Sequence, residues 1–249
     1  MKEDRKRNKR KRIIKFWIRF LILLLLAGGV FFCLKSPLFN VSEFTVTGNS
    51  YYNSNEILVM GNCKTGGNIF TGIDTKDIKA RLMNDAYMAD VVVKRKLPST
   101  IEIVLNERKQ IAALVYGEKF IVIDNQNMVL RKTSVDPQVS IIKGITLTKL
   151  NVGEACEIEE KVQLRQAIEL IETAQANDMY FKAIEFINSE MKCYVLDNLA
   201  CQGSLQDLKS GLESGAVQGV ISDLLNKGIE RGTVNVIEGN YVSYSPAVD

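Results

Sequence analysis

The stretch FWIRFLILLLLAGGVFFCL, residues 16–34, is apolar except for Arg19. Its 19 residues would form a helix of about 28 Å, close to the roughly 30 Å hydrocarbon core of a bilayer. Arg19 lies about one turn from the start of the run, where its long side chain can reach the lipid headgroups, and Trp17 suits the same interface. The run therefore predicts one transmembrane helix over residues 16–34.

Residues 1–15 form a basic tail before this run. From Lys2 to Arg19 the chain has ten basic and two acidic residues, a net charge of +8, whereas the remainder has 22 basic and 27 acidic residues, a net charge of −5. Lys and Arg are enriched on the cytoplasmic side of membrane spans. The asymmetry predicts a cytoplasmic tail and an exported C-terminal part.

Three other interpretations of the N-terminal region are weaker. A cleaved signal peptide needs small residues at its exit, but the residues before Lys35 are bulky and Ala27-Gly28-Gly29 lies inside the run. Lipid attachment at Cys33 would require small residues where two phenylalanines stand. Basic tails can bind nucleic acid, but beside a membrane span they usually set topology and contact anionic lipid. We therefore expect an uncleaved anchor and no nucleic-acid partner.

The exported part lacks the residue patterns of a metal site or an enzyme. The chain has no histidine, and no P-loop or nucleophile elbow is present. Four exported cysteines are widely spaced and form no CxxC pattern: Cys63, Cys156, Cys193 and Cys201. Disulfides between them stay open as an alternative to four isolated buried thiols. We expect no enzyme, and no catalytic, cofactor-binding or metal-binding residues.

Residues 38–107 predict the order strand, helix, helix, strand, strand. The stretch VSEFTVTGN, residues 41–49, alternates like a strand and stops at a Gly-Asn turn. Asn53 and Glu56 have the spacing of a capping box for a short helix, which Gly61 can end in a left-handed conformation. Asp74 can cap a second helix. Residues 89–108, ADVVVKRKLPSTIEIVLNER, then predict two strands joined by a proline-containing turn.

Three phrases in this region resemble the POTRA domain of the bacterial cell-division proteins FtsQ and DivIB. They are FTVTGNSYYNSNEI at residues 44–57, NIFTGID at residues 68–74, and VVVKRKLPSTIEIVLNERKQIAAL at residues 91–114. Lys109-Gln110 departs from the family pattern, which often has a proline after the arginine. Glu107 and Arg108 are expected to form a structural ion pair or a domain-junction contact and not a catalytic pair.

The resemblance implies a fold class and a domain order. We expect an α+β protein with a single N-terminal transmembrane helix, a POTRA domain (β-α-α-β-β) over residues 38–107, and a second mixed β-rich domain with helices over residues 108–239. In the second domain, residues 159–177 predict a helix whose apolar stripe includes Leu164, Ile168 and Gln175. Ser204 can cap a further helix. Residues 240–249 are expected to be an exposed C-terminal tail.

A binding role has a physical route, because strands at the edge of a sheet have unpaired backbone groups that a partner strand can use. We expect the last strand and two nearby tyrosines to bind a partner in this way; the alternative is that the tyrosines only cover their own sheet. The predicted partner-binding residues are Thr233, Val234, Val236, Ile237, Tyr241 and Tyr244. A second docking edge is expected near Val91 to Leu97.

The resemblance also implies function, partners and location. A single-pass protein of the cell membrane and division septum would bind FtsB-like or DivIC-like and FtsL-like division proteins outside the membrane. As a scaffold of the divisome it would help to recruit or regulate septal peptidoglycan synthesis, without a small-molecule substrate. The alternative is a POTRA-bearing export or chaperone factor that binds extended polypeptides.

Overall fold

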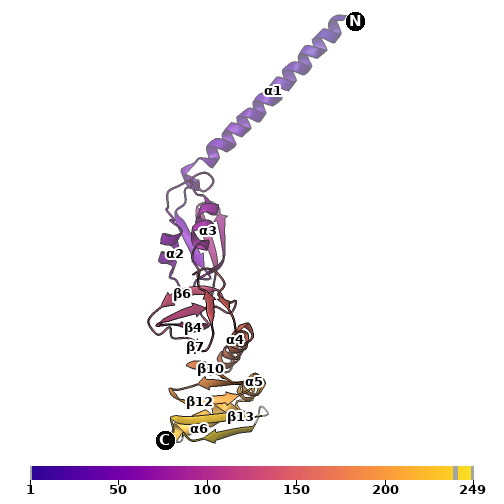
Figure 1. Cartoon of the computed structure of the whole chain (residues 1–249). Coiled ribbons are helices and arrows are strands. Elements are labelled where there is room, and N and C mark those ends of the chain that lie inside the picture. Colours follow the sequence, from indigo (N-terminus) through magenta and orange to yellow (C-terminus); the bar gives the residue numbers. More distant parts are fainter. Residues whose placement is uncertain (1, 238–240, 248–249) are drawn as a thin grey trace. The chain divides into compact units, whose positions relative to one another are not determined.

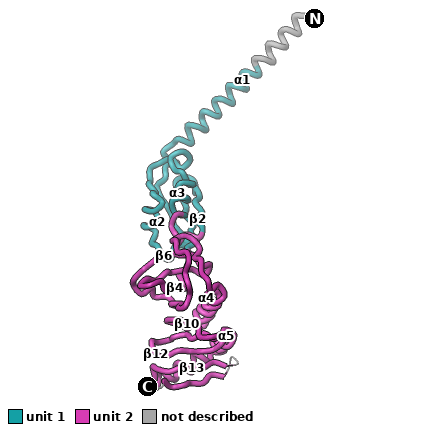
Figure 2. Tube along the Cα trace, in the orientation of Figure 1, with its two compact units in different colours: residues 1–83, 90–107 teal, residues 84–89, 108–249 magenta. Residues whose placement is uncertain are grey.

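The computed structural model describes residues 2–237 and 241–247, with side chains from Lys15 onward. It divides into two compact units, one of residues 1–83 and 90–107 and one of residues 84–89 and 108–249 (Figure 2). An N-terminal apolar helix is followed by a small mixed domain and by a larger, β-rich region with helices (Figure 1). The predicted α+β fold class is therefore confirmed.

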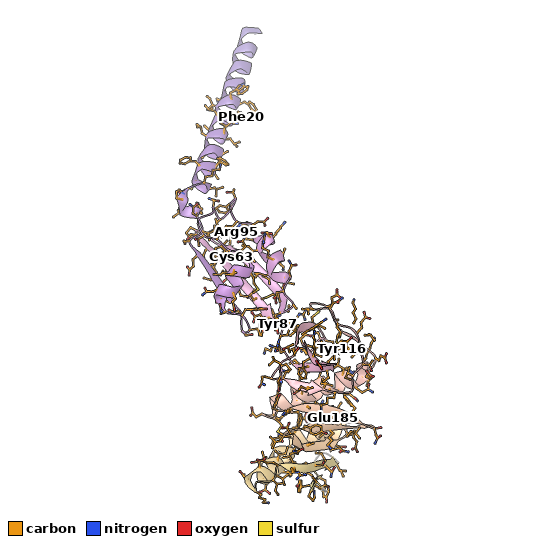
Figure 3. The ribbon with its side chains drawn as sticks, turned by 60° about the vertical axis from the view of Figure 1, so that its left-hand side comes forward. Phe20, Cys63, Tyr87, Arg95, Tyr116 and Glu185 are labelled. Carbon is orange, nitrogen blue, oxygen red and sulfur yellow. The ribbon has the colours of Figure 1, made fainter. Side chains whose placement is uncertain are left out.

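Helix α1, Lys2–Leu34, contains the apolar run. Its segment Lys15–Leu34 has the length and composition to cross a membrane, and none of it is buried within the protein. Figure 3 shows side chains such as Phe20 projecting from this helix. Apolar side chains on a helix that no other element covers are unfavourable in water and favourable in lipid.

A three-stranded sheet and two short helices follow α1. The elements are η1 (Pro37–Phe39), β1 (Glu43–Thr47), α2 (Ser54–Met60), α3 (Thr75–Met83), β2 (Met88–Lys96) and β3 (Thr100–Glu107). The strand order is β1-β3-β2, with β1 parallel to β3. Both helices and strands contribute buried side chains, including Ile57, Ile78, Leu82, Val91, Ile101 and Ile103. The element order is the predicted β-α-α-β-β.

Local signals in the sequence account for where these helices begin. Asn53 accepts a hydrogen bond from the Glu56 N–H at 3.0 Å, and the Glu56 carboxylate accepts one from the Asn53 N–H at 2.8 Å. The capping box of α2 is therefore confirmed. Asp74 likewise accepts from the N–H groups of Lys76 and Asp77 at the start of α3.

The end of α2 differs from the prediction. Gly61 has a right-handed φ of −71°, and Asn62 takes the left-handed conformation with φ 49°. The Cys63 N–H bonds the Leu58 carbonyl at 2.9 Å, which is the closing bond of a Schellman motif. That bond puts the left-handed residue one position later than the glycine, and asparagine tolerates it.

Glu107, at the end of β3, organises the loop that follows β1. Its buried carboxylate accepts hydrogen bonds from the N–H groups of Ser50 and Tyr51 at 2.7 and 2.6 Å. Arg108 instead forms an ion pair at 2.7 Å with the buried Asp124, whose carboxylate also orders its own turn. The two residues are structural, as expected, but each bonds within its own unit and they do not pair with each other.

The second unit is built on a nine-stranded mixed sheet with the order β14-β13-β12-β11-β10-β7-β4-β5-β6. Its strands are β4 (Ala112–Tyr116), β5 (Lys119–Ile123), β6 (Val129–Thr133), β7 (Ser140–Ile142), β10 (Ala183–Ile187), β11 (Glu190–Tyr194), β12 (Asn198–Gly203), β13 (Arg231–Ile237) and β14 (Tyr241–Ser245). The short β8 (Leu147–Lys149) and β9 (Glu157–Ile158) form a separate pair. β7 pairs in parallel with both β4 and β10 and so joins the antiparallel strands β4-β5-β6 to the rest of the sheet, in which β12 and β13 are also parallel.

Three helices cover one face of this sheet: α4 (Lys161–Ala176), α5 (Leu205–Glu213) and α6 (Ala216–Asn226). The predicted stripe on α4 is buried at Leu164 and Ile168, but Gln175 is exposed, and Ala174 takes the buried position. Ser204 caps α5 as predicted, by accepting from the Asp207 N–H. The other face carries polar side chains, including Glu185 (Figure 3).

The cysteines of the described structure are free thiols. Cys193 and Cys201 lie directly opposite each other on β11 and β12, and both side chains are buried in the core beneath the helices. Burial raises the pKa of Cys201 to about 12 and that of Cys193 well above its usual value. Both groups are held as neutral thiols that pack like small apolar residues.

Replacing Glu107 by Gln should lower the free energy of unfolding by about 1 to 3 kcal/mol, because the charged acceptor of the loop amides is lost. Chemical denaturation of the two proteins measures the difference. Glu118→Gln, at an exposed position in the β4–β5 turn, is the control and should change stability by less than about 0.5 kcal/mol. Equal effects of both substitutions would contradict the role given to Glu107.

Cys193 and Cys201 should resist a charged thiol reagent at mildly alkaline pH until denaturant is added, because the reactive thiolate is suppressed by burial. Single-cysteine variants that retain either residue provide the measurement. Labelling of the folded protein as fast as labelling of the unfolded chain would show that this part of the core is open.

Candidate partner-binding site

The structure places the six predicted partner-binding residues on two neighbouring strands. Thr233, Val234, Val236 and Ile237 lie on β13, which pairs with β12 on one side and with β14 on the other. The prediction that this strand is an open edge is therefore wrong. The reason is that residues 241–245, expected within a tail, form β14 and occupy the edge position. The tail residues Asn240, Val248 and Asp249 lie outside the described residues.

β14 has the sequence YVSYS, in which alternate side chains have different surroundings. Val242 and Tyr244 pack against the main hydrophobic core, whereas Tyr241 is 67% exposed. This period of two is the pattern of a strand with one buried face. It was the signal that could have identified β14 from sequence.

Tyr244 is fixed by both its ring and its hydroxyl. The hydroxyl donates a hydrogen bond to the Arg231 carbonyl at 2.6 Å. The ring lies over Gly232, whose φ is 129° and where a Cβ atom would come within 2.5 Å of the ring. Glycine is thus required here by close approach as well as by backbone conformation. Tyr244 holds β14 in place, and Tyr241 is the tyrosine available at the surface.

The outer side of β14 is an edge of the large sheet. Alternate backbone N–H and C=O groups of an edge strand point away from the sheet and lack partners within it. Natural proteins commonly protect such edges with charged side chains or with proline inside the strand. β14 contains neither, and Pro246 comes only after its last residue. The strand is therefore chemically suited to accept another strand.

The part of this edge that the structure describes shows no group of side chains that could bind a metal ion. Across residues 2–237 and 241–247, no group of three or more His, Cys, Asp or Glu side chains is placed to hold a metal ion. The second predicted docking region, near Val91 to Leu97, lies on β2, which is an edge strand of the small sheet. Both regions thus offer backbone hydrogen-bonding groups at sheet edges.

Comparisons with known proteins agree with this architecture. A model of the FtsQ-type POTRA domain matches residues 39–108. The cell division protein DivIB of Clostridium acetobutylicum is 31% identical over 217 residues, which cover 84% of each chain. The chain belongs to the DivIB family. DivIB of Clostridium botulinum is 26% identical over 244 residues, with 96% of this chain and 93% of that protein covered. DivIB of Bacillus subtilis is 24% identical over 211 residues, with coverage of 83% and 74%.

Family membership and α1 together make this chain a membrane-anchored protein of the DivIB type. The POTRA match covers the strands and helices from β1 to β3. The matches to DivIB proteins extend over most of the chain.

Tyr244→Phe should destabilise the second unit by about 1 kcal/mol, because the Arg231 carbonyl loses its hydroxyl donor. Tyr241→Phe is the matched control, since the same atom is removed from an exposed ring, and it should leave stability unchanged. Thermal unfolding of both variants tests the assignment. A larger loss for Tyr241→Phe than for Tyr244→Phe would reverse the roles given to the two tyrosines.

Proposed function

We propose that this chain is a scaffold of the divisome that binds other division proteins outside the membrane and helps to recruit or regulate septal peptidoglycan synthesis. Its relatives are cell division proteins, and its folded units carry accessible sheet edges. The export or chaperone alternative is not favoured, because the matched proteins are DivIB proteins over most of the chain. The proposed activity is binding, not catalysis.

The proposed binding mode is the addition of a partner strand to β14. The partner would bond to the outward backbone groups of residues 241–245, and Tyr241 would supply exposed apolar area beside them. In this arrangement β13 contributes indirectly: Val234 and Val236 are buried and hold the sheet behind β14. The partners proposed are FtsB-like or DivIC-like and FtsL-like membrane-anchored proteins.

The proposed location is the division septum, with the N-terminus in the cytoplasm. The net charge of +8 before the apolar run supports this orientation, because Lys and Arg are retained on the cytoplasmic side. Both folded units would then lie outside the membrane. A fluorescent fusion at midcell in dividing cells, and a topology reporter active only outside at the C-terminus, would support the two parts of this proposal separately.

Tyr241→Ala should weaken capture of the coiled-coil division partner by the full-length protein, because an exposed aromatic contact is removed. Val135→Ala is the matched control: Val135 is 74% exposed and also belongs to the second unit, but it is not part of β14. Quantitative pull-down with purified partner measures both. Equal capture by the Tyr241→Ala and Val135→Ala proteins would argue against β14.

Proline at two adjacent positions of β14 tests strand addition directly. Successive N–H groups of a strand point to opposite sides, so of Val242→Pro and Ser243→Pro one removes an outward donor and the other breaks the pairing with β13. The variant that removes the outward donor should lose partner capture but keep its thermal stability. The variant that breaks the pairing with β13 should lose thermal stability. Val236→Pro, within β13, should also lower thermal stability, because β13 is paired on both sides. Unimpaired capture by both β14 variants would exclude this edge.

A further inference from the structure

Three apolar side chains of the first unit are exposed near the end of α1 and have no part in the site proposed at β14. Leu38 is 64% exposed, Leu97 is 61% exposed and Phe70 is 38% exposed. They come from three separate segments: η1, the β2–β3 turn and the loop between α2 and α3. We refer to Leu38, Phe70 and Leu97 as the apolar rim.

Leu38 is held close to the membrane by chain length alone. It follows the last residue of α1, Leu34, by four positions, so the two Cα atoms are at most about 14 Å apart. The chain is in fact turned back, because Ser36 caps η1 and the Asn40 N–H bonds the Pro37 carbonyl at 3.0 Å. A headgroup layer adds roughly 5 to 8 Å to each side of the hydrocarbon core. Leu38 therefore lies within or beside that layer.

Asn68 holds Phe70 close to the end of α1. The Asn68 side-chain amide donates a hydrogen bond to the Leu34 carbonyl at 2.8 Å, and its oxygen accepts from the Phe70 N–H at 3.0 Å. One side chain thus joins the end of the membrane helix to the loop that carries Phe70. The Phe70 ring also packs on the Phe39 ring, with 5.4 Å between centroids.

The loop of residues 68–74 is further fixed by Arg95 from β2. The Arg95 guanidinium donates to the Ile69 carbonyl at 2.6 Å and to the Ile73 carbonyl at 3.0 Å. Gly72 makes the turn possible, since a Cβ atom there would come within 2.6 Å of the Asn68 nitrogen. Figure 3 labels Arg95 within the first unit. Phe70 is therefore exposed on a well-ordered loop.

Leu97 lies at the same end of the small sheet, because hydrogen bonds join the β2–β3 turn to the residues just before β1. The Ser42 N–H donates to the Ser99 carbonyl at 2.9 Å, and the two serine hydroxyls lie 3.1 Å apart. Ser42 follows Phe39 by only three residues. The β2–β3 turn and η1 are consequently neighbours.

We infer that the apolar rim is a lipid-binding surface that inserts into the headgroup region of the leaflet where α1 ends. Exposed apolar groups at this depth gain free energy by leaving water, and α1 already supplies a lipid-facing surface that ends next to them. Lys35, which directly follows the last residue of α1, is exposed and provides a cation at this end of the unit, where anionic headgroups attract it. The surface would restrict the tilt of the POTRA domain relative to the bilayer.

The inference is tested with the full-length protein reconstituted alone in vesicles. The single tryptophan, Trp17, is changed to Phe, and tryptophan is then introduced by Phe70→Trp or Leu97→Trp. We expect a blue-shifted emission and strong quenching by lipids brominated on their acyl chains. The control is Tyr51→Trp: Tyr51 is 46% exposed and lies at the opposite end of the small sheet, beside Glu107. Its quenching should be several-fold weaker.

The inference is overturned if both rim probes are quenched no more strongly than the Tyr51→Trp control. This includes the case in which the rim is covered only after a partner protein is added. Circular dichroism establishes that each variant is folded, and Leu38→Trp replaces either rim probe that fails this check. Because no partner is present, failure of the rim and failure of the β14 proposal are distinguished.

Arg95 provides a second test as a positioning residue. Arg95→Ala should reduce the quenching of Phe70→Trp, because the Ile69 and Ile73 carbonyls lose their donor, but should leave Leu97→Trp quenched. Lys94→Ala, at an exposed position on the same strand, is the control for the loss of one positive charge. An equal reduction by Lys94→Ala and Arg95→Ala would show that charge, and not loop geometry, controls contact with lipid.

Discussion

The hydrogen bond from Asn68 to the carbonyl of Leu34 links the membrane helix to the first folded unit. The last carbonyl groups of a helix have no partner within it, and at a membrane surface an unpaired group is costly. At the end of α1 the Phe31 and Cys33 carbonyls accept hydrogen bonds from N–H groups just after the helix, and the Leu34 carbonyl accepts one from the Asn68 side chain. The small sheet therefore begins where the span ends, without a long linker between them.

At the other end of the chain, the large sheet combines a secure strand with an exposed backbone. β14 is held from within by Val242 and by the hydroxyl and ring of Tyr244, while no strand of the described residues lies beside its outer backbone groups. An edge strand anchored in this way is already ordered before a partner arrives, so less conformational entropy is lost on binding. Rigidity of β14 and accessibility of its edge are thus compatible.

Local chemistry made much of the fold predictable from sequence, and long-range pairing made the rest difficult. The Asn53–Glu56 capping box, the Asp74 cap and the alternation in β3 involve neighbouring residues, and each was recognised. The insertion of β7 between β4 and β10 depends on segments about 30 to 40 residues apart, which no local pattern reports. The same limit affects the candidate site: the sequence predicts the two tyrosines, but it predicts the edge at residues 233–237, because residues 240–249 resemble an exposed tail.

Hydrogen-bond satisfaction also separates structural from functional residues in this chain. Glu107 and Arg108 are the most conspicuous charged pair of the family phrase, yet their side chains are already bonded to the loop at Ser50 and to Asp124. A partner could use them only by breaking these buried bonds, which is expensive. The outer backbone of β14 and the apolar rim have the opposite property, because their groups gain free energy when a strand or a lipid covers them. Binding is therefore favoured at these two surfaces. In the sequence, β14 is visible only as a short alternating stretch, and the apolar rim only as isolated apolar residues.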